Sequence, residues 1–272
     1  MMRFNELPKD GLVLLGCGKM GSALLSGWLA NGLRTDSIWI KEPNPSDWLR
    51  SQNIRLNTAI PAPPSVVVLA VKPQILNAAL AEFENLAVGS TLIISIAAGR
   101  TLESLETILG ASMPVIRAMP NTPASVNRGM TALIANQNVQ AVHREIAELF
   151  FNAVGRVVWL EREADIDAVT GVSGSGPAYV FHLVEALAAA GEANGLSSLL
   201  AKELAKETVV GAAELIRLSE DSPSTLRENV TSSKGTTAAA LQVLMDSKSG
   251  LAPLLAKAVE AATKRSKELS EG

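Results

Sequence analysis

Cysteine and histidine are scarce in this sequence of 272 residues. It contains one cysteine, Cys17, and two histidines, His143 and His182. A single cysteine excludes an internal disulfide framework, and the two histidines cannot complete a zinc site with it at any usual ligand spacing. We therefore expect a cytoplasmic protein whose chemistry uses no metal and has few acidic or basic side chains available.

Long apolar runs and clusters of basic residues are also missing. Hydrophobic residues make up 47% of the chain, yet no apolar run reaches the roughly 18 residues of a membrane span before Gly, Pro or a charge interrupts it. The net charge of -3 and the pI near 5.6, without any run of Lys or Arg, argue against a nucleic-acid partner. The sequence thus predicts a soluble protein of two domains, with no membrane or nucleic-acid partner.

A glycine-rich turn follows the first apolar run. Leu12–Leu15 reads as a buried strand, the next six residues spell G-x-G-x-x-G, and Ser22–Ala30 has the periodicity of a helix. In such a unit Gly16 makes the tight turn, Gly18 lets the backbone approach a pyrophosphate, and Gly21 lets the helix sit close to the strand. The order strand, glycine turn, helix therefore predicts a dinucleotide site, with the phosphates at the helix N-terminus.

Strand and helix patterns then alternate up to residue 162. The predicted strands are Ser37–Lys41, Val66–Val71, Thr91–Ile96, Pro114–Met119, Met130–Ala135 and Val157–Leu160, and the predicted helices are Asp47–Gln52, Gln74–Phe83, Leu102–Leu109 and Gln140–Phe151. This alternation predicts an α/β domain over residues 1–162, with a doubly wound, Rossmann-type parallel sheet whose ligands bind beyond the carboxyl ends of the strands.

Glu42 stands just past the second predicted strand, 21 residues beyond Gly21. An acidic residue there can accept hydrogen bonds from the adenosine ribose hydroxyls. Simple exposure to solvent is an equally open alternative, because Pro43-Asn44-Pro45 can turn the carboxylate away. In the first case the carboxylate repels the 2′-phosphate of NADPH and favours NADH.

From residue 163 onward the sequence shows only helical periodicity. The predicted helices are Ala178–Ala193, Leu199–Leu218, a short one that starts at Ser222-Pro223, Thr236–Met245 and Pro253–Leu269. We therefore expect an all-helical domain over residues 163–272. Because its Ala-rich helices have no sheet to cover, we expect them to pack against a second copy of the chain.

Two loops of this half have unusual composition. Ser173–Pro177 is rich in Gly and Ser, and Asn229–Thr237 combines hydroxyl side chains with the start of a helix. Backbone N–H groups at such a start suit a carboxylate ligand. Taken alone, each loop is better explained by helix capping than by a ligand site, but beside a dinucleotide domain the ligand interpretation is favoured.

The sequence resembles the pyrroline-5-carboxylate reductase family over nearly its whole length. The matching segments are Gly16–Gly21, Ala70–Pro73, Ser95–Gly99, Arg117–Pro123, Gly171–Tyr179 and the signature region Leu226–Leu241. The resemblance implies reduction of 1-pyrroline-5-carboxylate to L-proline with NADPH or NADH, and a helical domain that forms a homodimer able to assemble into larger rings. The sequence departs from the family pattern in the loop before the threonines, where Ser233-Lys234 replaces the usual Pro-Gly. This replacement could change the backbone shape of the loop.

The resemblance also assigns site residues. With Glu42 added from the argument above, the expected cofactor contacts are Gly16, Cys17, Gly18, Lys19, Met20, Gly21, Glu42, Asn57, Ala70, Val71, Lys72, Pro73, Ala97, Ala98 and Asn229. The expected substrate contacts are Glu220, Gly235, Thr236 and Thr237. Thr237 is the candidate for a hydrogen bond to the imine nitrogen, with electrostatic help from Glu220.

Two other functions are weighed against the reductase. A hydroxy-acid dehydrogenase on the same plan generally needs a basic side chain to take the hydroxyl proton, and none stands at a matching place in the helical domain. A non-catalytic NAD(P)-sensing protein would keep the glycine turn but would not need Glu220 or Thr237. An imine reductase fits the scarcity of acids and bases better, because a protonated imine is already electrophilic and needs mainly positioning.

Overall fold

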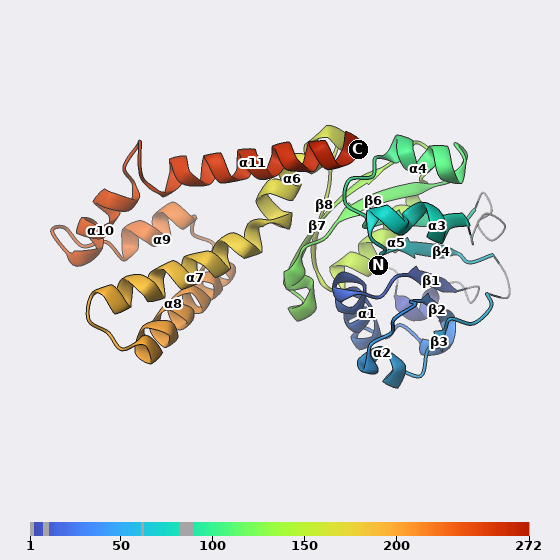
Figure 1. Cartoon of the computed structure of the whole chain (residues 1–272), viewed down its shortest axis with the longest axis horizontal. Coiled ribbons are helices and arrows are strands. Elements are labelled where there is room, and N and C mark those ends of the chain that lie inside the picture. Colours follow the sequence, from blue (N-terminus) through green and yellow to red (C-terminus); the bar gives the residue numbers. More distant parts are fainter. Residues whose placement is uncertain (1–2, 8–10, 61–62, 82–89, 272) are drawn as a thin grey trace. The chain divides into compact units, whose positions relative to one another are not determined.

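The computed structural model describes residues 3–7, 11–60, 63–81 and 90–271 (Figure 1). The chain divides into two compact units, one made of Met1–Gly174 with Ala262–Gly272 and the other of Ser175–Ala261. The domain limits expected from the sequence, 1–162 and 163–272, stay a prediction. None of the helices in the described ranges combines the length and the apolar character that a membrane crossing needs.

The first unit is built on an eight-stranded sheet of order β3-β2-β1-β4-β5-β6-β7-β8. Its strands are β1 (Leu12–Leu15), β2 (Ile38–Lys41), β3 (Arg55–Leu56), β4 (Val66–Leu69), β5 (Leu92–Ser95), β6 (Val115–Met119), β7 (Gly129–Ala135) and β8 (Gly155–Trp159). The strand order reverses between β1 and β4, which is the doubly wound, Rossmann-type plan predicted from the sequence. The glycine turn leaves β1 at this switch point.

The helices of this unit cover both faces of the sheet. They are α1 (Lys19–Ala30), α2 (Asp47–Ser51), α3 (Leu76–Ala81), α4 (Leu102–Leu109), α5 (Ala141–Asn152) and α6 (Ile166–Val169). Leu12 and Leu14 of β1 share a buried cluster with α1 and α5, whereas Val13 and Leu15 share one with α3 and α4. Successive strand residues thus pack against helices on opposite faces of the sheet, which explains why the strand sequences are continuous apolar runs.

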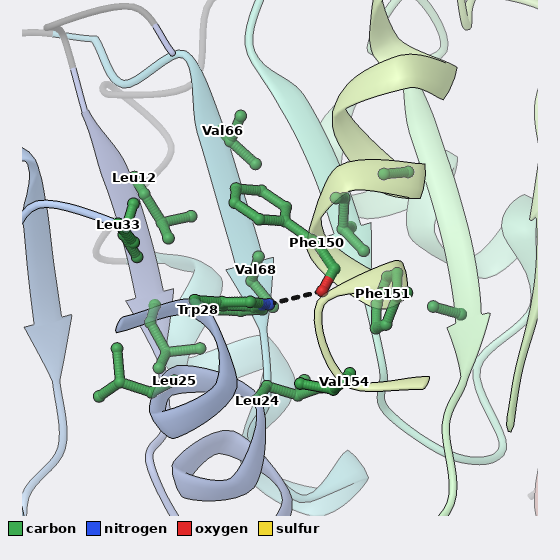
Figure 2. Packing of buried hydrophobic residues seen from close by; sticks show 14 of the residues in the cluster. Leu12, Leu24, Leu25, Trp28, Leu33, Val66, Val68, Phe150, Phe151 and Val154 are labelled. Carbon is green, nitrogen blue, oxygen red and sulfur yellow. Dashed lines mark hydrogen bonds between the residues drawn. The ribbon is translucent and has the colours of Figure 1, made fainter. Parts of the chain in front are cut away.

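The cluster under α1 and α5 fixes the helix that follows the glycine turn. Figure 2 shows Trp28 of α1 reaching toward Phe150 of α5, and its Nε1 donates a hydrogen bond to the Phe150 carbonyl oxygen over 2.8 Å. The two rings lie 4.9 Å apart between centroids, and both side chains are fully buried. Burial of two large aromatic side chains, with the polar indole N–H satisfied, anchors α1 on the sheet.

One strand pair runs against the expected direction. The sequence reading placed the last strands in a parallel sheet, but β7 is antiparallel to β6, while all the other neighbouring pairs are parallel. The connection between β6 and β7 contains only the 3-10 helix Thr122–Val126. A parallel return needs a crossover of about a dozen residues or more, so this short link imposes the antiparallel pairing.

The other predicted elements of this unit form with shifted ends. Helix α1 starts at Lys19, earlier than the expected Ser22, and the short strand β3 was not expected. The helix expected over Gln74–Phe83 begins as the 3-10 turn Pro73–Ile75 and continues as α3. Residues 82 and 83 of that prediction lie outside the described residues.

The second unit is helical throughout its described residues, as predicted. It contains α7 (Gly176–Ala193), α8 (Ser198–Leu218), α9 (Pro223–Asn229), α10 (Thr236–Leu244) and the first part of α11 (Leu251–Glu271), whose end belongs to the first unit. Small residues let α7 and α8 approach closely: a Cβ built on Gly191 would lie 3.2 Å from that of Ala201. Pro177 lies in the first turn of α7, where its missing N–H costs nothing.

Candidate active site

The three glycines of the turn after β1 have three different environments. Gly16 has a φ of +86°, and a Cβ there would lie 2.6 Å from the Ala70 carbonyl oxygen. A Cβ on Gly21 would lie 2.7 Å from the Gly16 carbonyl oxygen, so α1 packs directly on the turn. A Cβ on Gly18 would meet no atom of the described chain within 4 Å. Gly16 and Gly21 are thus explained by the fold, whereas Gly18 leaves open space beside the start of α1.

This open space fits the phosphates of a dinucleotide. Gly18 is the N-cap of α1 and has no side chain with which to cap it, and no other side chain in the described ranges accepts a hydrogen bond from the first N–H groups of the helix. Free N–H groups and the positive end of the helix dipole attract an anion. Lys19 and Met20 open this helix, and Lys19 is exposed and forms no ion pair with any described residue.

The Glu42 carboxylate faces the glycine turn. Its Oε2 accepts a hydrogen bond from the Cys17 backbone N–H over 2.7 Å, and its Oε1 accepts one from the Asn44 N–H over 2.9 Å. The loop after β2 therefore does not turn the carboxylate away, because the N–H of Asn44 in that loop helps to hold it. Contact with the ribose stays a prediction, and an ionised carboxylate has further lone pairs with which to accept hydroxyl groups.

Asn57 holds the backbone of Glu42 from the neighbouring strand. The Oδ1 of Asn57 accepts from the Glu42 N–H and its Nδ2 donates to the Glu42 carbonyl oxygen, both over 2.9 Å. Asn57 itself has a φ of +54°, a left-handed conformation that asparagine tolerates better than most residues. The direct cofactor contact that the resemblance assigns to Asn57 stays a prediction.

Cys17 is a buried member of the turn, with an exposed fraction of 5%. Ser22 donates a hydrogen bond from its Oγ to the Cys17 carbonyl oxygen over 2.8 Å. Burial, with a smaller contribution from the nearby Glu42 charge, raises the pKa of the Cys17 thiol above its usual value. The thiol is therefore protonated at neutral pH and is not an activated nucleophile.

The remaining expected cofactor residues of this unit follow β4 and β5, the next strands of the sheet. Ala70, Val71, Lys72 and Pro73 come directly after β4, and Ala97 and Ala98 come after β5. Because β1, β4 and β5 are parallel neighbours, all these residues lie at the same edge of the sheet as the glycine turn. Ala98 and Lys72 are exposed, and Ala97 is buried with its N–H donating to the Ser95 Oγ over 3.3 Å.

The expected substrate residues belong to the second unit. Gly235 is the N-cap of α10 and Thr236 and Thr237 open that helix, again without a side-chain cap. Glu220 lies before α9 and Asn229 ends it. Glu220, the fourth expected substrate residue, and Asn229, the expected cofactor residue of this unit, lie outside that turn in the sequence, and in the described part of the chain no hydrogen bond links either of them to the threonines.

The turn before α10 keeps a left-handed residue despite its unusual sequence. The Gly235 N–H donates to the Ser232 carbonyl oxygen over 3.0 Å, and Lys234 has a φ of +59°. A Cβ on Gly235 would lie 2.3 Å from the Ser232 Oγ and 3.1 Å from the Ser232 carbonyl oxygen, so a larger residue would displace the serine side chain. Ser233-Lys234 therefore sits in a tight four-residue turn of the kind for which Pro-Gly is best suited.

The stretch Ser173–Pro177, expected as a loop, is largely helical. Thr170–Gly174 forms a π-helical turn, a rare feature that often marks functional sites, and α7 follows it. The Asn121 Nδ2 donates to the Ser173 carbonyl oxygen over 3.0 Å, and its Oδ1 accepts from the Met130 N–H over 2.8 Å. The sequence reading missed this connecting role, for which an asparagine in a Pro-Asn-Thr-Pro turn was the available signal.

Two family models match the chain. Residues 163–269 match the model for pyrroline-5-carboxylate reductase dimerisation, and residues 12–99 match the model described as NADP oxidoreductase, coenzyme F420-dependent. The first match covers the helical half, and the second covers the glycine turn and the strand ends that follow it. The chain therefore carries a dimerisation domain beside a nicotinamide-nucleotide domain.

Known relatives match over almost the entire chain. The pyrroline-5-carboxylate reductase of Pseudomonas aeruginosa is 40% identical over 266 residues, which is 96% of this chain and 97% of the relative, and that of Synechocystis is 41% identical over 96% and 98%. The solved structure of the Coxiella burnetii reductase has a TM-score of 0.89 at 36% identity, covering 97% and 99% of the two chains. The Plasmodium falciparum enzyme, solved with NADP bound, has a TM-score of 0.82 at 31% identity, covering 96% and 98%.

Identity at this level over the full length, in chains of the same fold, leads to one conclusion: the chain belongs to the pyrroline-5-carboxylate reductase family.

Proposed function

We propose that this protein reduces 1-pyrroline-5-carboxylate to L-proline at the expense of NADPH or NADH. One hydride is added to the imine carbon and one proton ends on the ring nitrogen, so the C=N double bond becomes a C–N single bond and the nucleotide is oxidised. The observation that carries the proposal is the open space at Gly18 beside the uncapped start of α1, in a chain of this family.

The residues of the first unit would hold the nucleotide. Its nicotinamide ring, when bound, supplies the hydride. The N–H groups that begin α1 would bind the pyrophosphate, and the Glu42 carboxylate would accept ribose hydroxyls. Ala97 and Ala98 are small residues at a strand end, which suits the close approach of a flat ring.

The residues of the second unit would hold the substrate. The N–H groups of Thr236 and Thr237, at a helix start without a side-chain cap, would bind the substrate carboxylate, helped by the α10 dipole. The Thr237 hydroxyl would hold the imine nitrogen by a hydrogen bond, and the exposed Glu220 would stabilise the positive charge of the protonated imine. Correct placement of a protonated imine can supply much of the rate enhancement without a general base.

The two other candidate functions have less support. A hydroxy-acid dehydrogenase generally needs a base, and His182, the histidine of the helical half, is exposed on α7 beside Glu185 at 3.0 Å. A nucleotide-sensing protein would bind NAD(P) without turnover, which an activity assay distinguishes. We retain the reductase because its chemistry makes the least demand on titratable groups.

We further propose a homodimer formed through the helical unit. Large apolar side chains are exposed on α7 and α8, among them Phe181, Leu199 and Leu218 with exposed fractions of 64%, 80% and 65%. Such a surface supports a partner of the same kind, in line with the matched dimerisation model. Rings of dimers and a cytoplasmic location stay predictions of the sequence.

The function is tested by mixing the purified protein with 1-pyrroline-5-carboxylate and either NADPH or NADH. Consumption of the reduced nucleotide is followed by its absorbance. Thr237→Ala should lower kcat/KM by roughly 10- to 100-fold, the equivalent of about 1.4–2.8 kcal/mol, because one hydrogen bond in the transition state is lost. Its Kd for the nucleotide should stay at the wild-type value. Thr107→Ala is the matched control, since Thr107 is an exposed threonine of α4 whose hydroxyl donates to the Glu103 carbonyl oxygen of its own helix.

A wild-type protein that oxidises neither nucleotide with this substrate would refute the reductase proposal. Unchanged activity of Thr237→Ala would show instead that the imine nitrogen is held by another residue.

A further inference from the structure

Glu42 connects the glycine turn to the loop after β2. Its two carboxylate oxygens accept from backbone N–H groups on both sides, Cys17 in the turn at 2.7 Å and Asn44 in the loop at 2.9 Å. The carboxylate is half-buried and forms no ion pair with any described residue. Its neighbour Lys41, the last residue of β2, forms no ion pair with it. The negative charge of Glu42 is therefore held in place but not neutralised by a cation.

Asn57 holds the backbone from which this carboxylate extends. Both polar atoms of the Asn57 amide bond the backbone of Glu42, one to its N–H and one to its carbonyl oxygen, each over 2.9 Å. The Asn57 N–H also donates to the Ile40 carbonyl oxygen over 2.8 Å, so Asn57 bonds both β2 and the residue just past its end. Together these bonds fix the point at which the chain leaves β2, and with it the base of the Glu42 side chain.

We propose that Asn57 is a positioning residue that sets the preference between NADH and NADPH through Glu42. By fixing the Glu42 backbone, Asn57 keeps the carboxylate on the Cys17 N–H, where its remaining lone pairs accept the free 2′-hydroxyl of NADH and its charge repels the 2′-phosphate of NADPH. Without the clamp, the carboxylate can swing toward solvent and the penalty on the 2′-phosphate falls. The inference rests on nucleotide binding within the proposed function, but not on the identity of the reduced substrate.

The competing explanation is direct contact between Asn57 and the nucleotide, which the family resemblance implies. The two explanations differ in how the effects of two substitutions combine. If Asn57 acts through Glu42, its removal has no further effect on the preference once the Glu42 charge is gone. If Asn57 contacts the nucleotide itself, the two effects are independent and multiply.

The experiment is a double-mutant cycle on the ratio of the dissociation constants for NADPH and NADH, measured by titration calorimetry. The variants are Asn57→Gly, Glu42→Gln and the pair combined. Glycine tolerates the positive φ of residue 57, so only the side-chain bonds are lost. Asn53→Gly is the matched control, because Asn53 also has a left-handed φ of 52° but its side chain makes no hydrogen bond to the described residues.

We expect Glu42→Gln to shift the ratio toward NADPH by roughly 5- to 30-fold and Asn57→Gly to shift it the same way by roughly 3- to 10-fold. In the Glu42→Gln background, Asn57→Gly should change the ratio by less than about twofold, and Asn53→Gly should leave it unchanged. Melting curves of each variant check that it is folded. If Asn57→Gly is not folded, Asn57→Ser replaces it in the same cycle, because the short serine side chain cannot span both backbone groups.

A shift by Asn57→Gly of equal size in both backgrounds would overturn the proposal in favour of direct contact. So would an unchanged ratio with weaker binding of both nucleotides, since that is what a purely structural role produces. A protein that binds both nucleotides but does not reduce 1-pyrroline-5-carboxylate would refute only the proposed function, and the cycle would still decide this inference.

Discussion

Replacement of Gly18 by alanine should separate nucleotide binding from folding. The Gly18 backbone has φ -68° and ψ -160°, a conformation that alanine adopts without strain, and the added methyl group would meet no atom of the described chain within 4 Å. Alanine is a poorer N-cap than glycine by about 0.5–1 kcal/mol, and it restricts the unfolded chain by a similar amount. These two effects oppose each other, so the free energy of unfolding should stay within about 1 kcal/mol of the wild type.

The same methyl group should hinder a bound dinucleotide, because it occupies the space into which the pyrophosphate would come. We expect the Kd for NADPH to rise by roughly 10- to 100-fold, the equivalent of about 1.4–2.8 kcal/mol. Gly21→Ala is the contrasting variant. Its Cβ would lie 2.7 Å from the Gly16 carbonyl oxygen, and Gly16 is itself closely packed, since a Cβ built on it would lie 2.6 Å from the Ala70 carbonyl oxygen. This overpacking should lower stability by about 1–3 kcal/mol.

Urea unfolding and titration calorimetry, performed on both variants and the wild type, measure the two effects separately. Gly18→Ala should keep its unfolding midpoint and bind NADPH weakly, whereas Gly21→Ala should shift the midpoint downward. Wild-type affinity in Gly18→Ala would refute the argument, since it would mean that the space beside Gly18 is not where the phosphates bind.

Three further predictions concern stability. The Thr131 hydroxyl is buried and has no hydrogen-bond partner among the described residues, so Thr131→Val should stabilise the fold by about 1–2 kcal/mol in urea unfolding, and Thr131→Ser should not. Lys234→Gly should raise the free energy of unfolding by about 1 kcal/mol in the same assay, because the φ of +59° costs glycine nothing; a loss would show that the lysine side chain stabilises the turn. His143 accepts the Gln140 N–H at its Nδ1, and burial lowers its pKa below 6.5, so the folded protein holds this ring neutral. The stability that the neutral His143 ring contributes is complete above about pH 6.5 and is lost as the pH falls through the lower pKa of the folded state. His143→Gln should therefore flatten the fall of Tm between pH 7 and pH 5, and an unchanged slope would contradict this prediction.

The parts that the sequence predicted correctly are those decided by local pattern. The apolar run Leu12–Leu15, the glycine spacing and the apolar stripe of α1 lie within one short stretch, and each has its own physical reason there. The chain reversal between β6 and β7 was missed because both strands have the same apolar character, and only the length of their connection decides the direction. The helical continuation from Thr170 into α7 was missed because a stretch rich in Gly and Ser is also typical of loops.

The orientation of Glu42 shows a different limit of sequence reasoning. Pro43-Asn44-Pro45 gave a good local reason for the carboxylate to turn outward, yet the Asn44 N–H is one of the two groups that hold it inward. The second group, the Cys17 N–H, and the clamp by Asn57 come from residues 25 and 15 positions away. Such a side chain is placed by the pairing of β1, β2 and β3, so its direction could be known only once the sheet was known.

The turn before α10 shows that a departure from a family pattern is compatible with a tight turn. Serine and lysine have no preference for the conformations that proline and glycine favour, so Ser233-Lys234 would be free to form another loop. The turn that forms is closed by the Gly235 N–H, which donates to the Ser232 carbonyl oxygen, and a Cβ on Gly235 would lie 2.3 Å from the Ser232 Oγ and displace it. With both ends fixed, Lys234 accepts the positive φ at a cost of about 1–2 kcal/mol. A left-handed third residue is what the glycine of Pro-Gly favours, so Ser233-Lys234 adds a charge to the loop in a turn of the kind that Pro-Gly forms.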